Sequence, residues 1–166
     1  GIVITASHNP PQYNGYKVYW SHGGQVGPEL AEKIFESIRR ADYFDIDTSS
    51  LASVNESQMI CTVSDLVDEA YYKKALSLRL NPELMQERGA NFRVVYTPLH
   101  GAGLVPVTEI LKRAGLKKLR VVEEQAQPDG DFPTVAAPNP EDPNAFTLAL
   151  QLAKKTDAQL LLATDP

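Results

Sequence analysis

The feature that most constrains the fold is a regular alternation of strand and helix patterns over residues 92–163. Short apolar runs alternate with longer segments in which apolar residues recur at helical spacing. Gly115 follows the first expected helix as a C-terminal signal, and Asn144 precedes the second as an N-cap. Because parallel strands need crossover helices, this order predicts a three-layer α/β/α domain with right-handed connections. The expected elements are strand 92–96, helix 105–114, strand 119–122, helix 145–155 and strand 159–163.

The residues before this alternation predict part of another α/β domain. Two apolar runs, 1–4 and 16–20, are predicted strands, and Pro28 stands at the favoured first position of a helix. Residues 45–58 are mostly polar and lack periodicity, so they form a boundary region. The fold class is therefore α/β, with mixed, mainly parallel sheets in two partial or complete domains.

We place the domain boundary at the end of this polar region, between residues 58 and 59. A short strand at 59–63 is expected to open the second domain. A helix capped by Ser64 or Asp65 follows it and keeps its apolar spacing up to Asn81 and Pro82. Residues 1–58 thus belong to one domain and residues 59–166 to the next.

Composition excludes several classes of function. The chain has 166 residues, is 43% hydrophobic and carries a net charge of −5, which gives no basic field for nucleic acid. It contains no long apolar run and no signal peptide, so we expect no membrane partner. The single Cys61 excludes an internal disulfide, fits a reducing cytoplasm and is interpreted as a small buried hydrophobe.

A polar loop that contains Ser7 and His8 follows the first apolar strand. The turn formers after His8 stop that strand, and the next strand returns Lys17 toward the loop. A serine hydroxyl placed in this way can carry a phosphoryl group, which a cation and an imidazole stabilise. A serine hydrolase pair is disfavoured, because adjacent side chains on an extended loop diverge and no G-x-S-x-G elbow is present. As bare residues, Ser7 and His8 are also common turn formers.

The run TASHNPPQYNGYKVYW resembles the active-site serine loop of the α-D-phosphohexomutases, in particular their phosphoglucomutase and phosphopentomutase branch. The resemblance implies that Ser7 is the phosphoserine of the resting enzyme. It also implies that His8 and Lys17 flank the phosphoryl group, with Lys17 a candidate general acid or base.

Three further segments resemble the same family. Residues 97–103 are similar to its LHG-x-G loop, where glycines would let a helix N-terminus point its amides at an anion. Residues 128–141 are similar to its DG-x-FPTV and PNPE element, which we interpret as an ordered surface loop. Asp165 matches the first carboxylate of the D-x-D-x-D-R metal loop, which implies a Mg²⁺ ligand next to the Ser7 phosphate. His22 and His100 are interpreted as loop-ordering residues.

The resemblance implies a phosphoglucomutase that interconverts glucose 1-phosphate and glucose 6-phosphate, with glucose 1,6-bisphosphate as intermediate or activator. A phosphomannomutase or phosphopentomutase is the alternative enzyme, and a phosphate-binding interaction module is the alternative outside enzymes. The chain starts on an apolar strand and stops straight after another, so we expect a piece of a longer protein. Its partners would be a phosphosugar and the remaining domains of the parent chain. The 166 residues alone are expected to be inactive.

Overall fold

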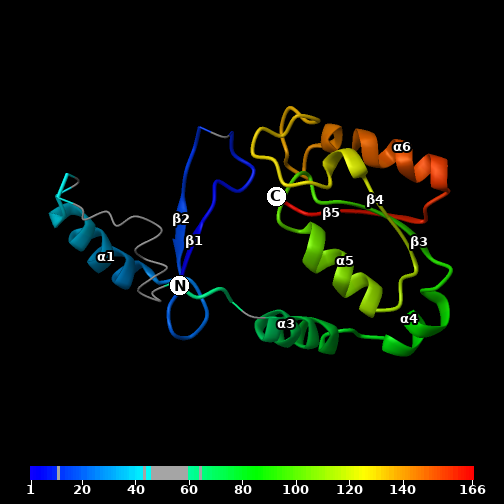
Figure 1. The fold of residues 1–166 in the computed structure, drawn as a ribbon, viewed down its shortest axis with the longest axis horizontal. Helices are drawn as coiled ribbons and strands as arrows, with labels where there is room; N and C mark the ends of the chain where they lie inside the picture. The colour runs from blue at the N-terminus through cyan, green and yellow to red at the C-terminus, as the bar shows by residue number, and fades with distance from the viewer. Residues whose placement is uncertain (11, 43, 46–59, 64) are drawn as a thin grey trace. The chain divides into compact units, whose positions relative to one another are not determined.

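The computed structural model describes residues 1–10, 12–42, 44–45, 60–63 and 65–166. The contacts divide the chain into two compact units, which Figure 1 traces by colour along the sequence. The first unit comprises Gly1–Thr5 and Gly15–Asp65, and the second comprises Ala6–Asn14 and Leu66–Pro166. The expected boundary between residues 58 and 59 lies outside the described residues. In the part of the chain that is described, no helix is long and apolar enough to cross a membrane.

The first unit contains a two-stranded antiparallel sheet and one helix. Strand β1 (Ile2–Ile4) pairs with β2 (Tyr16–Val18), and this register sets Val3 opposite Lys17. Helix α1 (Pro28–Arg40) begins at Pro28, as the sequence predicts, because the fixed φ of proline suits the first helical turn. Strand β2 is shorter than expected, since beyond Val18 only an isolated bridge from Tyr19 to Gln25 continues the pairing.

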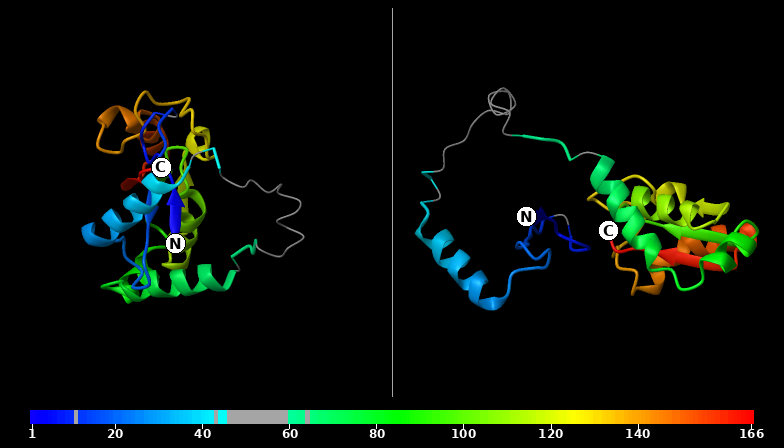
Figure 2. Two further views of the ribbon diagram at one scale, coloured as in Figure 1. Left: turned by 90° about the vertical axis from the view of Figure 1, so that its left-hand side faces the viewer. Right: turned by 90° about the horizontal axis from the view of Figure 1, so that it is seen from below.

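The second unit is built on a parallel sheet of order β4-β3-β5. Strand β3 (Arg93–Thr97) lies in the centre and pairs in parallel with β4 (Lys118–Val121) and β5 (Leu160–Ala163). Helices α5 (Leu104–Arg113) and α6 (Thr147–Thr156) cover opposite faces of this sheet (Figures 1 and 2). The predicted three-layer α/β fold with a parallel sheet is therefore confirmed.

The core of the second unit lies mainly between β3 and α6. Val95, Val122 and Ala149 are almost completely buried there, and Leu152 and Leu161 pack around them. The alternation of the strands accounts for this, because Val95 and its parallel partner Leu161 point to the same face. Packing of these aliphatic side chains holds the strands in position, and the candidate site lies just beyond the carboxyl ends of the strands.

Several local expectations are wrong. Residues 60–63 form no strand, and Cys61 is exposed rather than buried. Helix α3 (Asp65–Ser77) starts where expected, but a further helix, α4 (Pro82–Arg88), follows it. Pro82 does not only end the preceding helical pattern, as the sequence suggests, because it stands in the first turn of α4, where a missing N–H has no cost.

The connections that follow β4 also differ from expectation. A short 3₁₀ helix, η1 (Glu123–Gln125), follows β4, and another, η2 (Pro143–Phe146), precedes α6. Asn144 is not a helix cap, because it lies inside η2 and its amide N–H donates to the Asp142 carboxylate at 2.9 Å. Asp142 is the residue that caps η2.

Arg113 ties α3 to α5 on the face of the sheet opposite α6. Its guanidinium donates to both carboxylate oxygens of Glu69, at 2.7 and 2.6 Å, and to Glu109 at 2.6 Å. It also lies 4.7 Å from the centre of the Tyr72 ring. The hydrogen bond from Arg113 lowers the pKa of Glu69, and its carboxylate partners raise the pKa of Arg113. The pair therefore stays charged over the neutral pH range and fixes α3 along α5.

Candidate active site

Ser7 lies on the loop that follows β1, in a backbone conformation that few serines adopt. Its φ is 57°, in the left-handed region, and the loop is closed by a hydrogen bond from the Asn9 amide to the Ala6 carbonyl at 3.0 Å. A non-glycine residue in this region costs conformational energy, which is a recurrent feature of functional loops. Ala6–Asn14 belongs to the second unit, so the Ser7 hydroxyl can be compared directly with the ends of the parallel strands.

The Ser7 and His8 side chains meet the carboxylate of Asp165. The Ser7 hydroxyl donates to Asp165 Oδ2 at 2.7 Å, and His8 Nδ1 lies 2.7 Å from Asp165 Oδ1. Because an ionised carboxylate only accepts hydrogen bonds, both partners act as donors. The His8 and Asp165 side chains are 42% and 47% exposed, so these bonds stabilise the fold little and can be exchanged for a ligand.

The strand before Asp165 is held by the centre of the sheet. The Thr164 amide donates to the Thr97 carbonyl at 3.2 Å, and the Thr164 hydroxyl lies 2.8 Å from the Tyr96 hydroxyl. Burial raises the pKa of the Tyr96 phenol, an effect that its hydrogen bond with Thr164 partly offsets. Tyr96 therefore remains a neutral partner at physiological pH and fixes the residue directly before Asp165.

The residue after Asp165 rests on the loop between β3 and α5. The Ala102 amide donates to the Pro166 carbonyl at 3.0 Å. A Cβ at Gly101 would overlap the Pro166 backbone, and one at Gly103 would overlap the hydroxyls of Thr164 and Tyr96. The two glycines are thus required for close packing around Asp165. The Ala102 N–H is used by Pro166, and the expectation that other amides at this helix N-terminus bind an anion stays a prediction.

Ser7, His8 and Asp165 are therefore brought together at the carboxyl ends of the parallel strands, where open α/β sheets bind their ligands. Lys17 lies on β2 in the first unit, opposite Val3, with an exposed side chain. Its position beside the phosphoryl group stays a prediction. The sequence analysis missed Tyr96 and Thr164. The sequence feature that could have indicated them is that each is a hydroxyl-bearing residue at the carboxyl end of an apolar strand, β3 or β5.

The donor set around Asp165 is suited to a hard cation. Carboxylate and hydroxyl oxygens are the ligands that Mg²⁺ prefers, and Asp165 and Ser7 supply one of each at a separation of 2.7 Å. Among the described residues, no group of three or more His, Cys, Asp or Glu side chains could hold a metal ion. A cation at Asp165 would thus need the Ser7 phosphate, water or residues elsewhere in the full-length protein to complete its coordination.

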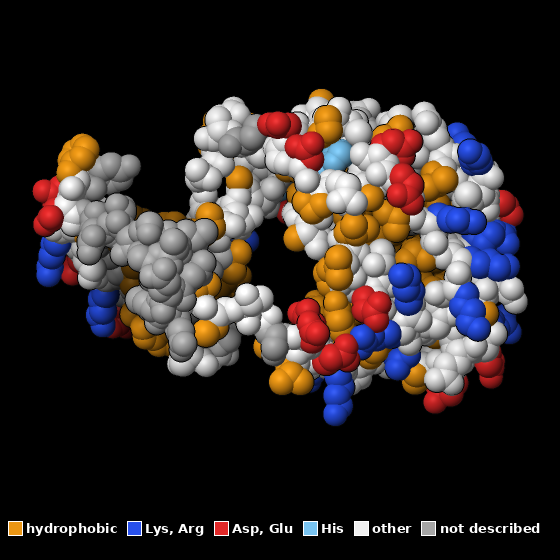
Figure 3. Space-filling view, viewed as in Figure 1, with side chains coloured by type: hydrophobic (Ala, Val, Ile, Leu, Met, Phe, Trp, Pro, Cys, Tyr) orange, Lys and Arg blue, Asp and Glu red, His pale blue; other side chains and the backbone are white. Residues whose placement is uncertain are grey.

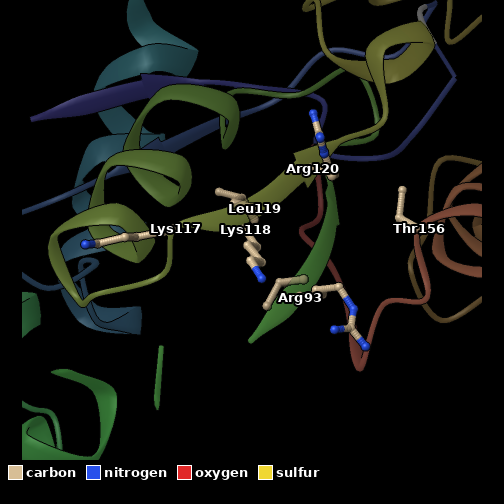
Figure 4. Close-up of a pocket in the computed structure, with 7 residues that line it drawn as sticks. Arg93, Lys117, Lys118, Leu119, Arg120 and Thr156 are labelled. Carbon is tan, nitrogen blue, oxygen red and sulfur yellow. The ribbon is translucent and has the colours of Figure 1, made fainter. Parts of the chain in front are cut away.

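A basic pocket lies at the other end of the same sheet, near the amino-terminal ends of β3 and β4. Figure 3 shows Lys and Arg side chains gathered at the edge where, in Figure 1, α6 ends and β5 begins. The pocket has a volume of about 490 Å³, and its polar lining comes from Arg93, Lys117, Lys118, Arg120 and Thr156. In Figure 4 the Lys117 side chain points away from Arg120 and Thr156, and Arg93 donates to Asp157 at 2.6 Å. These cationic side chains do not converge on one point, so the pocket is not arranged to bind a phosphate group.

Comparison with known protein families shows which family the chain belongs to. Residues 69–166 match the model of the phosphoglucomutase/phosphomannomutase α/β/α domain II, and residues 1–44 match that of domain I. The chain belongs to the phosphoglucomutase/phosphomannomutase family. The phosphohexomutase resemblance of the serine loop is thereby confirmed, and the Ser7 loop falls in the domain I match while Asp165 falls in the domain II match.

Individual relatives cover the whole chain. It is 42% identical to a phosphoglucomutase of Staphylococcus saprophyticus, of which it spans 29%, and 36% identical to a probable phosphomannomutase of Haemophilus influenzae, of which it spans 33%. Its fold is similar to the crystal structure of a putative phosphomannomutase from Thermus thermophilus, with a TM-score of 0.71 and 25% identity over 99% of this chain and 34% of that one. The chain spans about a third of the length of the relatives that it matches.

Proposed function

We propose that the full-length protein is a phosphoglucomutase that interconverts glucose 1-phosphate and glucose 6-phosphate through a phosphoserine at Ser7. The observation that carries the proposal is the contact of the Ser7 hydroxyl with Asp165, at the edge of a parallel sheet where phosphosugars can approach. The 42% identity to a phosphoglucomutase over the whole chain favours glucose among the possible phosphosugars. The cytoplasm, where phosphosugars are metabolised, is the proposed location.

The proposed reaction is two phosphoryl transfers in opposite directions. In the first, the free hydroxyl of the sugar phosphate attacks phosphorus and gives its proton to a base, while the bond from phosphorus to Ser7 Oγ breaks and Oγ takes up a proton. The product is glucose 1,6-bisphosphate, which turns over within the site. In the second, Ser7 Oγ attacks the other phosphorus and gives its proton to a base, the bond from that phosphorus to the sugar oxygen breaks, and the sugar oxygen takes up a proton as the isomeric monophosphate departs. Phosphoryl transfer needs little covalent help beyond positioning and charge stabilisation.

The residues of the site divide these tasks. Asp165 accepts the hydrogen bond of the Ser7 hydroxyl and so orients Oγ toward an incoming phosphate. His8 holds the other carboxylate oxygen while Ser7 is unphosphorylated and becomes a donor to phosphate oxygens once the phosphoryl group is in place. When bound, Mg²⁺ would be held by Asp165 and the Ser7 phosphate, and would offset the negative charge of the migrating group.

Lys17 is proposed to transfer a proton or to stabilise the migrating phosphoryl group. Replacing Lys17 with methionine keeps an unbranched side chain of similar size and removes its charge, so turnover should fall by about two to four orders of magnitude. Steady-state assays of the full-length protein measure this. Lys33→Met, which replaces an exposed lysine on α1 that pairs with Glu29, is the matched control and should retain wild-type turnover. A Lys17→Met variant as active as that control would remove Lys17 from the mechanism.

The substrate class is tested with the full-length protein and a panel of phosphosugars. Glucose 1-phosphate with glucose 1,6-bisphosphate should give the highest kcat/KM, and ribose 1-phosphate the lowest. A preference for mannose 1-phosphate would favour the phosphomannomutase alternative, which the relative from Haemophilus influenzae supports. If no phosphosugar is converted and Ser7 never becomes phosphorylated, the phosphate-binding module is the better description.

A further inference from the structure

A network of polar side chains lies next to the loop that supports Asp165. Thr97 and Gln125 are completely buried at its centre, and His100 is 5% exposed. The Thr97 hydroxyl donates to Gln125 Oε1 at 2.7 Å, and Gln125 Nε2 donates to the Thr134 hydroxyl at 3.0 Å. His100 Nε2 lies 2.9 Å from the same Thr134 oxygen. This polar network thereby joins the end of β3, the η1 segment and the Pro-rich loop.

The direction of every hydrogen bond in the polar network can be assigned from its end groups. His100 Nδ1 lies 3.2 Å from the Gln127 carbonyl, which only accepts, so Nδ1 carries the proton. In the neutral ring Nε2 is then an acceptor, and the Thr134 hydroxyl donates to it while accepting from Gln125. At the other end, the Thr97 hydroxyl accepts from the Leu99 amide at 3.1 Å. Removal of the Thr97 hydroxyl leaves the buried Gln125 Oε1 and the Leu99 amide without this partner, and removal of the Thr134 hydroxyl does the same to Gln125 Nε2 and His100 Nε2.

The polar network fixes an unusual backbone segment. Leu99 and His100 have φ of 49° and 59°, both in the left-handed region that side chains disfavour. The Leu99 amide is held by Thr97, the His100 amide donates to the Gln125 carbonyl at 2.9 Å, and the His100 carbonyl accepts from the Asp129 amide at 3.0 Å. Two consecutive strained residues persist only where their surroundings hold them in place. Here the surroundings are the Thr97 hydroxyl and the backbone of Gln125 and Asp129, and the Gln125 backbone is held in turn by the hydrogen bonds of its side chain.

The strained segment continues directly into the residues that support Asp165. Gly101 follows His100 and lies against the Pro166 backbone, and the Ala102 amide donates to the Pro166 carbonyl. A change in the backbone at Leu99 and His100 would move this support, and with it the position of the Asp165 carboxylate relative to Ser7. The coupling passes through contiguous covalent and hydrogen bonds, with no gap between Thr97 and Pro166.

We infer that Thr97 and Gln125, with Thr134 and His100, are positioning residues that set the Asp165 carboxylate for its partners at the site. They act through the left-handed turn at Leu99 and His100 and through the Ala102 contact with Pro166. The inference deepens the proposed function and rests on it for the role of Asp165 as a metal ligand. Second-sphere partners of this kind change metal affinity by about 10- to 100-fold when they are replaced.

The test compares two substitutions of Thr97 in the full-length protein. Thr97→Val keeps the shape and removes the hydroxyl, whereas Thr97→Ser keeps the hydroxyl. We expect Thr97→Val to weaken Mg²⁺ binding by about tenfold in calorimetry and to speed hydrogen exchange at the Ala102 amide, read at single-residue resolution without metal. Thr97→Ser should behave as wild type. Gly101→Ala, which disturbs the Pro166 contact directly, is the positive reference for both measurements.

Two further variants separate positioning from general stability. Leu116 is 4% exposed and precedes β4, at the other end of the strands, so Leu116→Ala should destabilise the unit without changing Mg²⁺ affinity or exchange at Ala102. Thr134→Val replaces an exposed residue and decides the question if Thr97→Val does not fold. Wild-type Ala102 exchange in the valine variants would overturn the inference. Absence of any Mg²⁺ binding in the wild-type protein would instead count against the proposed metal site, and the exchange result would still decide on positioning.

Discussion

Replacing Ser7 with alanine is expected to abolish the phosphoenzyme and to lower turnover of the full-length protein by roughly four to six orders of magnitude, as loss of a nucleophile does in other enzymes. The change removes the atom that the proposed reaction phosphorylates, which is the hydroxyl oxygen in contact with Asp165. The fold should be unaffected, because Ser7 lies on a loop outside the core. Intact mass after incubation with glucose 1,6-bisphosphate and steady-state rates measure the two effects.

The matched control for this prediction is Ser21→Ala. Ser21 is an exposed loop serine of the first unit, so its replacement should leave both the phosphate adduct and the rate unchanged. A phosphorylated Ser7→Ala protein would show that another residue carries the phosphate. Turnover in Ser7→Ala within tenfold of wild type would rule out a phosphoserine mechanism altogether.

The fold of the second unit could be predicted because its strands and helices carry strong local signals. Strand β3 contains the buried apolar run 94–96 and β5 is entirely apolar, and Gly115, whose φ of 115° favours glycine, follows the end of α5. Helix α4 was missed because Pro82 has two opposite meanings, a terminator and an N1 residue, that only the packing distinguishes. The cap before α6 was misplaced by two residues for a similar reason, since Asp142 and Asn144 are both good caps.

The site could be predicted only where a specific motif exists. Ser7 and His8 were identified from the serine loop and Asp165 from a resemblance at the end of β5, but their meeting joins residues 158 and 157 positions apart, which no local pattern encodes. Gln125 and Thr134 carry no signal at all, because buried glutamine and loop threonine are ordinary residues until their partners are known. From the sequence, Gly101 is expected to let a helix N-terminus point its amides at an anion. In the structure, Gly101 is needed because any side chain there would overlap the Pro166 backbone.

Replacing Asp165 with asparagine should weaken Mg²⁺ binding by about 100-fold and reduce turnover by about three orders of magnitude, because a hard cation loses an anionic ligand and the site loses its charge. Asparagine keeps the size of the side chain but offers one acceptor oxygen where the carboxylate offers two. Ser7 and His8 each donate to a different oxygen of Asp165, so one of them would face an NH₂ group instead. The orientation of Ser7 Oγ is therefore lost together with the charge.

Asp157→Asn provides the control for this substitution at the other edge of the same sheet. Asp157 has a φ of 50°, which asparagine tolerates, and its carboxylate pairs with Arg93, away from Ser7. The control should match the wild-type protein in Mg²⁺ affinity and in turnover. It therefore separates the effect of losing a carboxylate at the site from the effect of losing a carboxylate elsewhere in the unit. Equal Mg²⁺ affinity in the Asp165→Asn and Asp157→Asn variants would mean that Asp165 is no metal ligand. If turnover alone then fell in Asp165→Asn, the contribution of Asp165 would lie in its hydrogen bonds to Ser7 and His8, which hold the nucleophile ready for the returning phosphate.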